Sequence, residues 1–140
     1  MTLPSAVSGL LAAGRIEAVP TDLPSARQRV ARARDKLDTA TKISTIDSEV
    51  AYVTAYDAAR IAISAHMLAA GFRVRATNGA HEATGIYAEA MINDPSVREF
   101  QRMRRRRNKA EYDDIIVSLA DVQADLVHAT GIVEAVAAML

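Results

Sequence analysis

Apolar residues recur at intervals of three and four positions through most of this sequence, which is the spacing of one face of an α-helix. The first regular stretch predicts a helix over residues 25–42, with Ser25 and Gln28 at capping-box spacing near its start. Its inward face consists of Val30, Ala33, Leu37 and Ala40. Before it, an apolar patch from Val7 to Ala13 predicts a short helix or arm within residues 1–22 that packs on the main body.

A second, longer helix is predicted from caps in the segment Ser44–Asp47 to about Ala70, with Gly71 as a left-handed stop. Apolar residues lie on nearly all of its faces, which is typical of the central helix of a bundle. We interpret residues 71–75 as a loop, with a short extended stretch as the alternative. Asn78-Gly79 then predicts a turn before a third, shorter helix, whose inward face consists of Ala83, Ile86, Tyr87, Ala90 and Met91.

Two further helices follow in the second half of the chain. Asp94 and Pro95 provide an N-cap and a first-turn proline for a fourth helix that ends near Tyr112. Ser118 and Asp121 begin a fifth helix that continues to the last residue. Its inward face consists of Leu119, Val122, Leu126, Ala129, Val133, Val136 and Leu140.

These patterns predict an all-α fold, an up-and-down antiparallel bundle of about five helices over residues 23–140. Alanine is abundant, whereas the chain has two Phe, four Tyr and no Trp, a composition that favours closely packed helices over strands. Gly131 lies inside the last predicted helix, where glycine costs about 1 kcal/mol relative to alanine. We therefore expect a close contact with another helix at Gly131.

Several classes of chemistry are excluded by the sequence. The chain has no cysteine, and its histidines (His66, His81 and His128) form no recognised ligand spacing, so neither a metal nor another cofactor is expected. Neither the GxxxxGK[ST] nor the GxGxxG phosphate-binding motif is present. No apolar run is long enough for a membrane span, and the first residues do not resemble a signal peptide. We expect a cytoplasmic protein without membrane contact.

The formal net charge is zero, but the basic residues are concentrated in one segment. From Arg98 to Lys109 there are seven basic residues and one acidic residue, which gives +6 here and leaves −6 for the remainder. Such a segment indicates a localised anion site or a surface that meets an acidic partner. A solvated basic helix face is the alternative.

Helical spacing separates Arg107 from most of the other arginines. Arg107 shares a face of the fourth predicted helix with Phe100, Met103 and Ala110 and therefore lies on or beside the packed face. There it needs a carboxylate, carbonyl or phosphate partner, because a buried unpaired charge is costly. It is either a structural residue, in an ion pair or as a donor that caps a helix end, or an anion-binding residue in a cleft. The residues predicted to point away from the packed face are Arg102, Arg105, Arg106 and Lys109.

Two segments carry a resemblance to a known family. The order of the helices, the central sequence Tyr56-Asp57-Ala58-Ala59-Arg60 and the late run FQRMRRRRNKAEYD (residues 100–113) together resemble the HEPN superfamily over residues 25–140. More narrowly, the chain is similar to small actinobacterial HEPN proteins with an RN-x3-Y-D variant of the family motif. The resemblance implies a helical bundle that dimerises and brings two arginine motifs to a shared cleft. Many members are metal-independent ribonucleases, and others are toxins neutralised by a nucleotidyltransferase that can modify a tyrosine.

The resemblance assigns roles to particular positions. Arg107 is the motif arginine, Asn108 the adjacent polar residue, and Tyr112 stands where the family has its histidine. A tyrosine titrates near pH 10 and is a poor general base at neutral pH, although it can donate a hydrogen bond. Glu111 is an alternative base, and His81 at the start of the third predicted helix is an alternative source of the imidazole. Binding of RNA or a nucleotide needs no proton transfer; the candidates for it are Arg102, Arg104, Arg105, Arg106, Lys109 and His81.

Three hypotheses follow for the function. The leading one is a homodimeric HEPN-type module that binds RNA or a partner, such as a nucleotidyltransferase antitoxin, in a toxin–antitoxin or defence-like system. The second is an active metal-independent endoribonuclease that uses Arg107. The third is a structural or scaffold protein whose arginines only meet an acidic surface.

Overall fold

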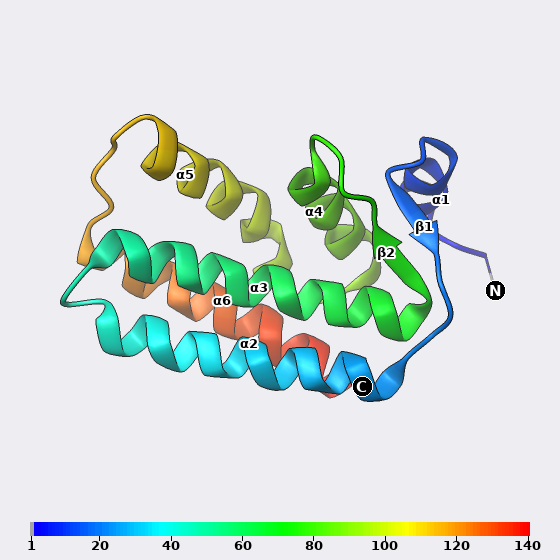
Figure 1. The fold of residues 1–140 in the computed structure, drawn as a ribbon, viewed down its shortest axis with the longest axis horizontal. Coiled ribbons are helices and arrows are strands. Elements are labelled where there is room, and N and C mark those ends of the chain that lie inside the picture. The colour runs from blue at the N-terminus through cyan, green and yellow to red at the C-terminus, as the bar shows by residue number, and fades with distance from the viewer. Residues whose placement is uncertain (1) are drawn as a thin grey trace.

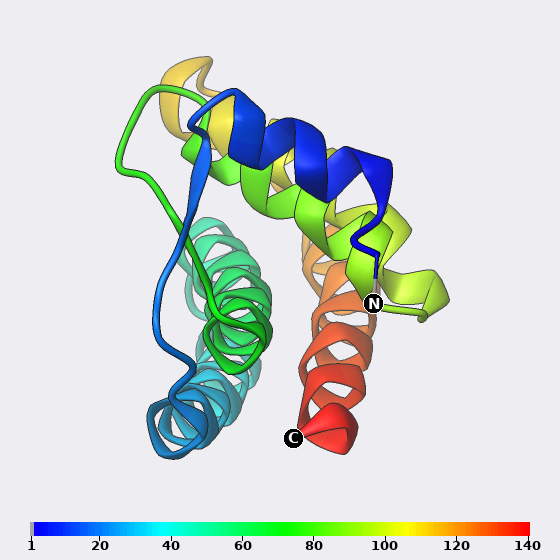
Figure 2. The same ribbon diagram turned by 90° about the vertical axis from the view of Figure 1, so that its right-hand side faces the viewer.

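The computed structural model describes residues 2–140 as a helical protein with one pair of short strands (Figure 1). The three long helices, α2, α3 and α6, pack against one another, and α1, α4 and α5 lie on the side of this group that is away from α2 (Figures 1 and 2). In chain order the elements are α1 (Ser5–Ala12), β1 (Ile16–Ala18), α2 (Leu23–Ile43), α3 (Ser48–Ala70), β2 (Phe72–Val74), α4 (Ala80–Met91), the 3-10 helix η1 (Pro95–Glu99), α5 (Phe100–Tyr112) and α6 (Leu119–Met139).

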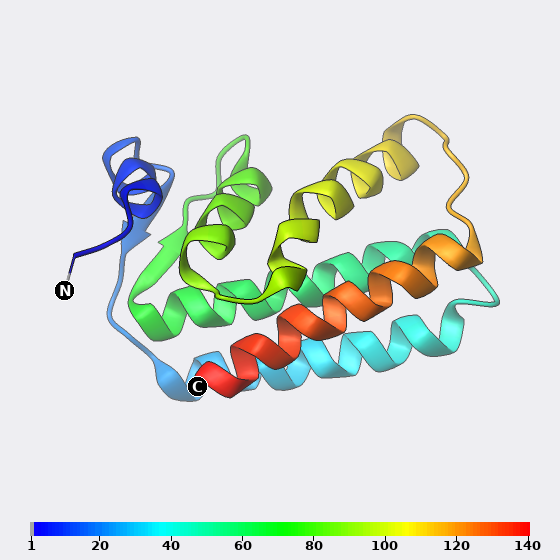
Figure 3. The ribbon, with the colours of Figure 1, turned by 180° about the vertical axis from the view of Figure 1, so that it is seen from behind.

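Contacts between distant residues fix the directions of the main helices. The start of α2 meets the end of α6, where Arg27 donates a hydrogen bond to the Leu140 carbonyl, so these helices are antiparallel. Near their starts, α3 and α6 are joined by a hydrogen bond between Tyr52 and Asp125, so these two run the same way. The helix α5 runs against both and leads back into α6 through the loop after Tyr112 (Figure 3). The predicted all-α helical bundle is confirmed.

The central position predicted for the second long helix is also confirmed. More residues are buried on α3 than on any other helix, and they include Tyr52, Tyr56 and Ile63, each 0% exposed. Ring stacking joins α3 to α5, because the centroids of Tyr56 and Phe100 lie 5.0 Å apart. Among residues 2–140, none of the helices combines the length and apolar character needed to cross a membrane.

The interpretation of residues 71–75 as a loop is wrong in part, because Phe72–Val74 forms strand β2. It pairs antiparallel with β1, with Ile16 opposite Val74 and Ala18 opposite Phe72. Three residues with alternating apolar character are too few to predict a strand, and here the partner lies more than fifty positions away in the sequence. The helix α1 packs on α4, and its Val7 and Leu10 belong to the main hydrophobic core.

The helix ends were predicted well, with two corrections. The fourth predicted helix begins at Pro95 as the 3-10 helix η1 and is α-helical only from Phe100. Asp47 caps α3, and Gly71 ends it with a φ of 92°. Ser118 and Asp121 begin α6 as predicted, and in the structure they form a capping box. However, α2 is capped by Asp22, whose carboxylate accepts a hydrogen bond from the Ser25 backbone N–H, so Ser25 lies inside the first turn rather than before it.

Candidate functional site

The helix α5 directs its arginines to different neighbours. Phe100, Met103 and Ala110 are buried and hold one face of α5 against the bundle. The Arg107 side chain lies on this face and is only 19% exposed, as its spacing predicts. Two of the other arginines, Arg102 and Arg106, meet α6, whereas Arg107 itself meets α3.

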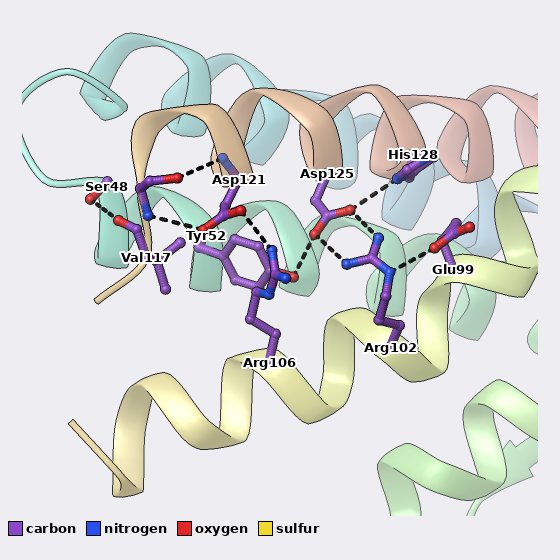
Figure 4. A network of polar contacts seen from close by, with 10 residues as sticks. Ser48, Tyr52, Glu99, Arg102, Arg106, Val117, Asp121, Asp125 and His128 are labelled. Atoms are coloured by element: carbon purple, nitrogen blue, oxygen red, sulfur yellow. Dashed lines mark hydrogen bonds and ion pairs between the residues drawn. The ribbon is translucent and has the colours of Figure 1, made fainter. Parts of the chain in front are cut away.

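Toward α6, Arg102 is held in a network of acidic partners (Figure 4). Its Nη1 and Nη2 atoms lie 3.1 and 2.5 Å from the two carboxylate oxygens of Asp125, and its Nε lies 2.8 Å from Glu99. Asp125 is 1% exposed and also accepts a hydrogen bond of 2.6 Å from the Tyr52 hydroxyl. Burial raises the pKa of Asp125, but the hydrogen bonds from Arg102, Tyr52 and His128 outweigh it and hold this pKa below the ordinary value.

Arg106 makes a similar contact one turn later. Its Nη1 lies 3.0 Å from Asp121 of α6. The prediction that Arg102 and Arg106 point away from the packed face is therefore wrong. The periodicity of α5 indicates only which of its positions are apolar. It does not predict that carboxylates of α6 lie beside the polar side of α5 that carries Arg102 and Arg106.

Toward α3 and α4, Arg107 meets a different set of residues. Its guanidinium carbon lies 5.8 Å from the centre of the Tyr56 ring, a distance at which a cation is attracted to the ring face. Its Nη1 lies 3.1 Å from Glu111, one turn further along α5. The ring centroids of Tyr56 and His81 are 5.7 Å apart, which brings the start of α4 to the same place.

Four residues define what we name the Arg107 cluster: Tyr56 and Arg60 from α3, His81 from α4 and Arg107 from α5. Within the part of the chain that the structure describes, three of its buried polar atoms have no hydrogen-bond partner, namely Tyr56 Oη, Arg60 Nε and Arg107 Nε. Buried polar groups are normally paired, and those that are not need an explanation. All three are hydrogen-bond donors of the kind that bind anions. However, Arg60 Nε also lies 3.6 Å from Asp57, and Arg107 pairs with Glu111 through its Nη1.

Burial and the positive charges within the cluster shift the pKa values of His81 and Tyr56. Burial lowers the pKa of His81, and the positive charges of Arg60, Arg107 and Arg104 lower it further, with Asp57 acting the other way. Both effects favour the neutral imidazole of His81. Burial also raises the pKa of Tyr56, which keeps its hydroxyl protonated and able to donate.

The other predicted site residues lie around this cluster or away from it. Asn108 is adjacent, with Oδ1 3.5 Å from Arg107 Nη1. Arg104 Nε donates to Gln101 at the edge of the cluster. Tyr112 is 77% exposed. Arg105 and Lys109 are exposed and lie on the other flank, in a shallow hollow shared with Arg102 and Arg106.

Tyr56 and Arg60 belong to a segment that carries the family resemblance, but the sequence pattern assigned them no role in the site. They stand four positions apart on α3, and this spacing places them on one face of the helix, but nothing in the pattern of α3 shows that the face meets Arg107. Among residues 2–140, no three histidine or carboxylate groups are arranged to hold a metal ion. In comparisons with known proteins, no family model, curated protein or solved structure matches this chain.

A Tyr56→Phe variant tests whether the hydroxyl lacks a structural partner. Removing a buried hydroxyl without a partner should raise the free energy of unfolding by about 1 kcal/mol, measured by urea denaturation. The matched control is Tyr87→Phe, which removes a hydroxyl that lies 2.9 Å from His66 Nδ1. This control should lose about 1 kcal/mol. Equal losses in both variants would contradict the assignment of a free hydroxyl to Tyr56.

Proposed function

We propose that this chain is a HEPN-type domain that binds RNA in the cytoplasm through the Arg107 cluster. The observation that carries the proposal is the set of three buried polar atoms without partners, at Tyr56, Arg60 and Arg107. All three can donate a hydrogen bond, and two belong to guanidinium groups, whose planar fork fits a phosphate. An RNA phosphate is an anion of the right charge and hydrogen-bonding capacity.

The biological setting comes from the family resemblance. We propose a homodimer that acts in a toxin–antitoxin or defence-like system, with a nucleotidyltransferase as a candidate partner. The exposed hydroxyl of Tyr112 is accessible to such a partner, which fits modification better than a role beside Arg107. The scaffold hypothesis is not favoured by Arg102 and Arg106, since each already pairs with a carboxylate of its own chain.

RNA binding is tested by fluorescence anisotropy with a labelled single-stranded RNA. The Arg107→Gln variant should bind about 10- to 100-fold more weakly than the wild type, because a hydrogen bond to a charged group contributes about 1.5–3 kcal/mol. The control is Arg34→Gln, which removes the same charge from an exposed ion pair with Glu134. Equal affinity of all three proteins would contradict the proposed site, and light scattering on the same samples checks the dimer.

A second candidate function, metal-independent RNA cleavage, is favoured by the position of His81. A neutral imidazole can take the proton from a ribose 2′-hydroxyl. The 2′-oxygen then forms a bond to the adjacent phosphorus, the bond from phosphorus to the 5′-oxygen breaks, and the leaving oxygen takes a proton from water. Arg60 and Arg107 would stabilise the negative charge that develops on the phosphate.

The cleavage assay is carried out in EDTA. If the second function holds, Arg107→Ala and His81→Gln should each abolish cleavage, whereas Tyr112→Phe and Glu111→Gln should retain it. Loss in Tyr112→Phe alone would assign the chemistry to the motif position instead. No cleavage by wild-type protein that binds RNA would restrict the function to binding.

The titration of His81 gives a prediction that is independent of activity. In an NMR titration the pKa of His81 should lie below 6.5, and Arg60→Gln should move it upward, because one of the neighbouring positive charges is removed. Arg34→Gln should leave it unchanged. Because bound phosphate favours the protonated imidazole, RNA affinity should rise as the pH falls through this pKa. A pKa that is insensitive to Arg60 would contradict the proximity of the two residues.

A further inference from the structure

A groove of about 380 Å³ adjoins the Arg107 cluster on the side of α2. This volume is in the range of small-molecule and cofactor sites. Residues from α2, α3, β2 and the start of α4 line it. Its basic lining residues are Arg29, Arg32, Arg60, Arg73 and His81.

No carboxylate lines this groove. Its positive charge is therefore balanced only in part, by carboxylates that lie beside the groove. Arg73 forms an ion pair with Glu17, and Arg60 Nε lies 3.6 Å from Asp57. Within the described residues, Arg29 and Arg32 have no carboxylate at ion-pair distance. The positive charge of Arg29 helps to lower the pKa of Asp22, the N-cap of α2, but the two side chains form no ion pair. Both arginines are exposed, three positions apart on one face of α2. The groove therefore keeps a surplus of positive charge that an anion would neutralise.

The rest of the lining is mainly apolar and favours a particular kind of anion. It consists of Ile61, Ser64, Met67, Phe72, Val74, Ala80 and Thr84. A bare phosphate would leave this apolar surface uncovered. A nucleotide combines a phosphate for the arginines with a base, whose face can pack on the Phe72 ring.

Arg60 and His81 belong to both the groove and the Arg107 cluster, so the two sites are continuous. We propose that the groove is a second RNA subsite, in which Arg29 and Arg32 bind the backbone phosphates next to the one held by the Arg107 cluster. This subsite rests on the proposed function, because both sites would hold one single strand. It also predicts which way the strand extends, from α5 across the start of α4 toward α2.

The test compares the salt dependence of RNA affinity in four proteins: wild type, Arg107→Gln, the double variant Arg29→Gln/Arg32→Gln, and Arg34→Gln. Each phosphate contact on a single strand contributes about 0.7 to the slope of log affinity against log salt concentration. Losing two contacts should therefore reduce the magnitude of this negative slope by about 1.4. The ratio of wild-type to variant affinity should then be about 25-fold larger at 0.1 M salt than at 1 M salt. Arg34 is the matched control, since it lies on α2 but pairs with Glu134 on α6, and it should leave the slope unchanged.

The outcomes separate this subsite from the proposed function. If Arg107→Gln and the double variant both weaken binding and lower the slope, both proposals are supported. Loss in Arg107→Gln alone would overturn the groove subsite and leave the proposed function standing. Loss in the double variant alone would show that the groove binds RNA by itself, and it would overturn the Arg107 site together with the proposed path of the strand between the two. A wild-type protein that binds no RNA would overturn both. Because Arg29 and Arg32 are exposed, the double variant should unfold at the wild-type urea concentration, which separates binding from folding.

Discussion

Replacing Asp125 with alanine is expected to lower the free energy of unfolding by about 3 kcal/mol or more. The carboxylate is 1% exposed and is the shared acceptor for Arg102, Tyr52 and His128. Without it, the Tyr52 hydroxyl and one side of the guanidinium stay desolvated with no partner. Arg102 still pairs with Glu99 in this variant and is partly exposed to water. The expected loss therefore lies toward the lower end of the range for a broken buried ion pair.

Urea denaturation measures this loss, and Glu134→Ala is the matched control. That variant removes a carboxylate that also pairs with an arginine, Arg34, but at an exposed position, and it should cost no more than about 1 kcal/mol. A double variant, Arg102→Met/Asp125→Leu, should recover part of the loss by removing both charges. If Asp125→Ala costs no more than Glu134→Ala, the network does not hold α5 on α6.

The same network gives a defined acid dependence. Folding lowers the pKa of Asp125, so its contribution to stability is present above the unfolded value near 3.8 and is lost as the pH falls through the folded value. Asp125→Asn cannot titrate, and its free energy of unfolding should fall less steeply than that of the wild type below pH 3.8. Parallel curves for the two proteins would contradict this assignment.

Gly131→Ala should lower the free energy of unfolding by about 2 kcal/mol, even though alanine is the better helix former. A Cβ atom at Gly131 would lie 2.2 Å from Ser96 Oγ and 2.9 Å from Ser96 Cβ, which forces α6 away from η1. This confirms the close approach that the glycine indicates in the sequence. Because η1 leads directly into α5, the displacement would also disturb the helix that carries Arg107.

The control for this prediction is Gly9→Ala in α1, where nothing lies within 4 Å of an added Cβ. That variant should gain about 0.5–1 kcal/mol from helix propensity alone. Adding Ser96→Gly to Gly131→Ala should restore most of the lost stability, because it removes both atoms that the new Cβ meets. A stabilising Gly131→Ala would show that η1 can shift at no cost.

Local sequence features predicted the elements with good accuracy and the site only in part. The spacing of Phe100, Met103 and Ala110 placed Arg107 on the packed face of α5, which the structure confirms. The same spacing wrongly placed Arg102 on the outside, because its partner Asp125 lies 23 positions away on another helix. His81 was one of several candidate residues, and only the packing of α4 places its ring beside Tyr56.

The sequence by itself determined the helices, most of their caps and the face of α5 that is buried, because these depend on residues within one or two turns of each other. The tertiary structure decided which arginines meet carboxylates and which meet the buried surface of Tyr56. It also decided that residues 16–18 and 72–74 pair as strands. These outcomes depend on how helices pack, and a periodic pattern reports that a face is buried without naming the residues that bury it.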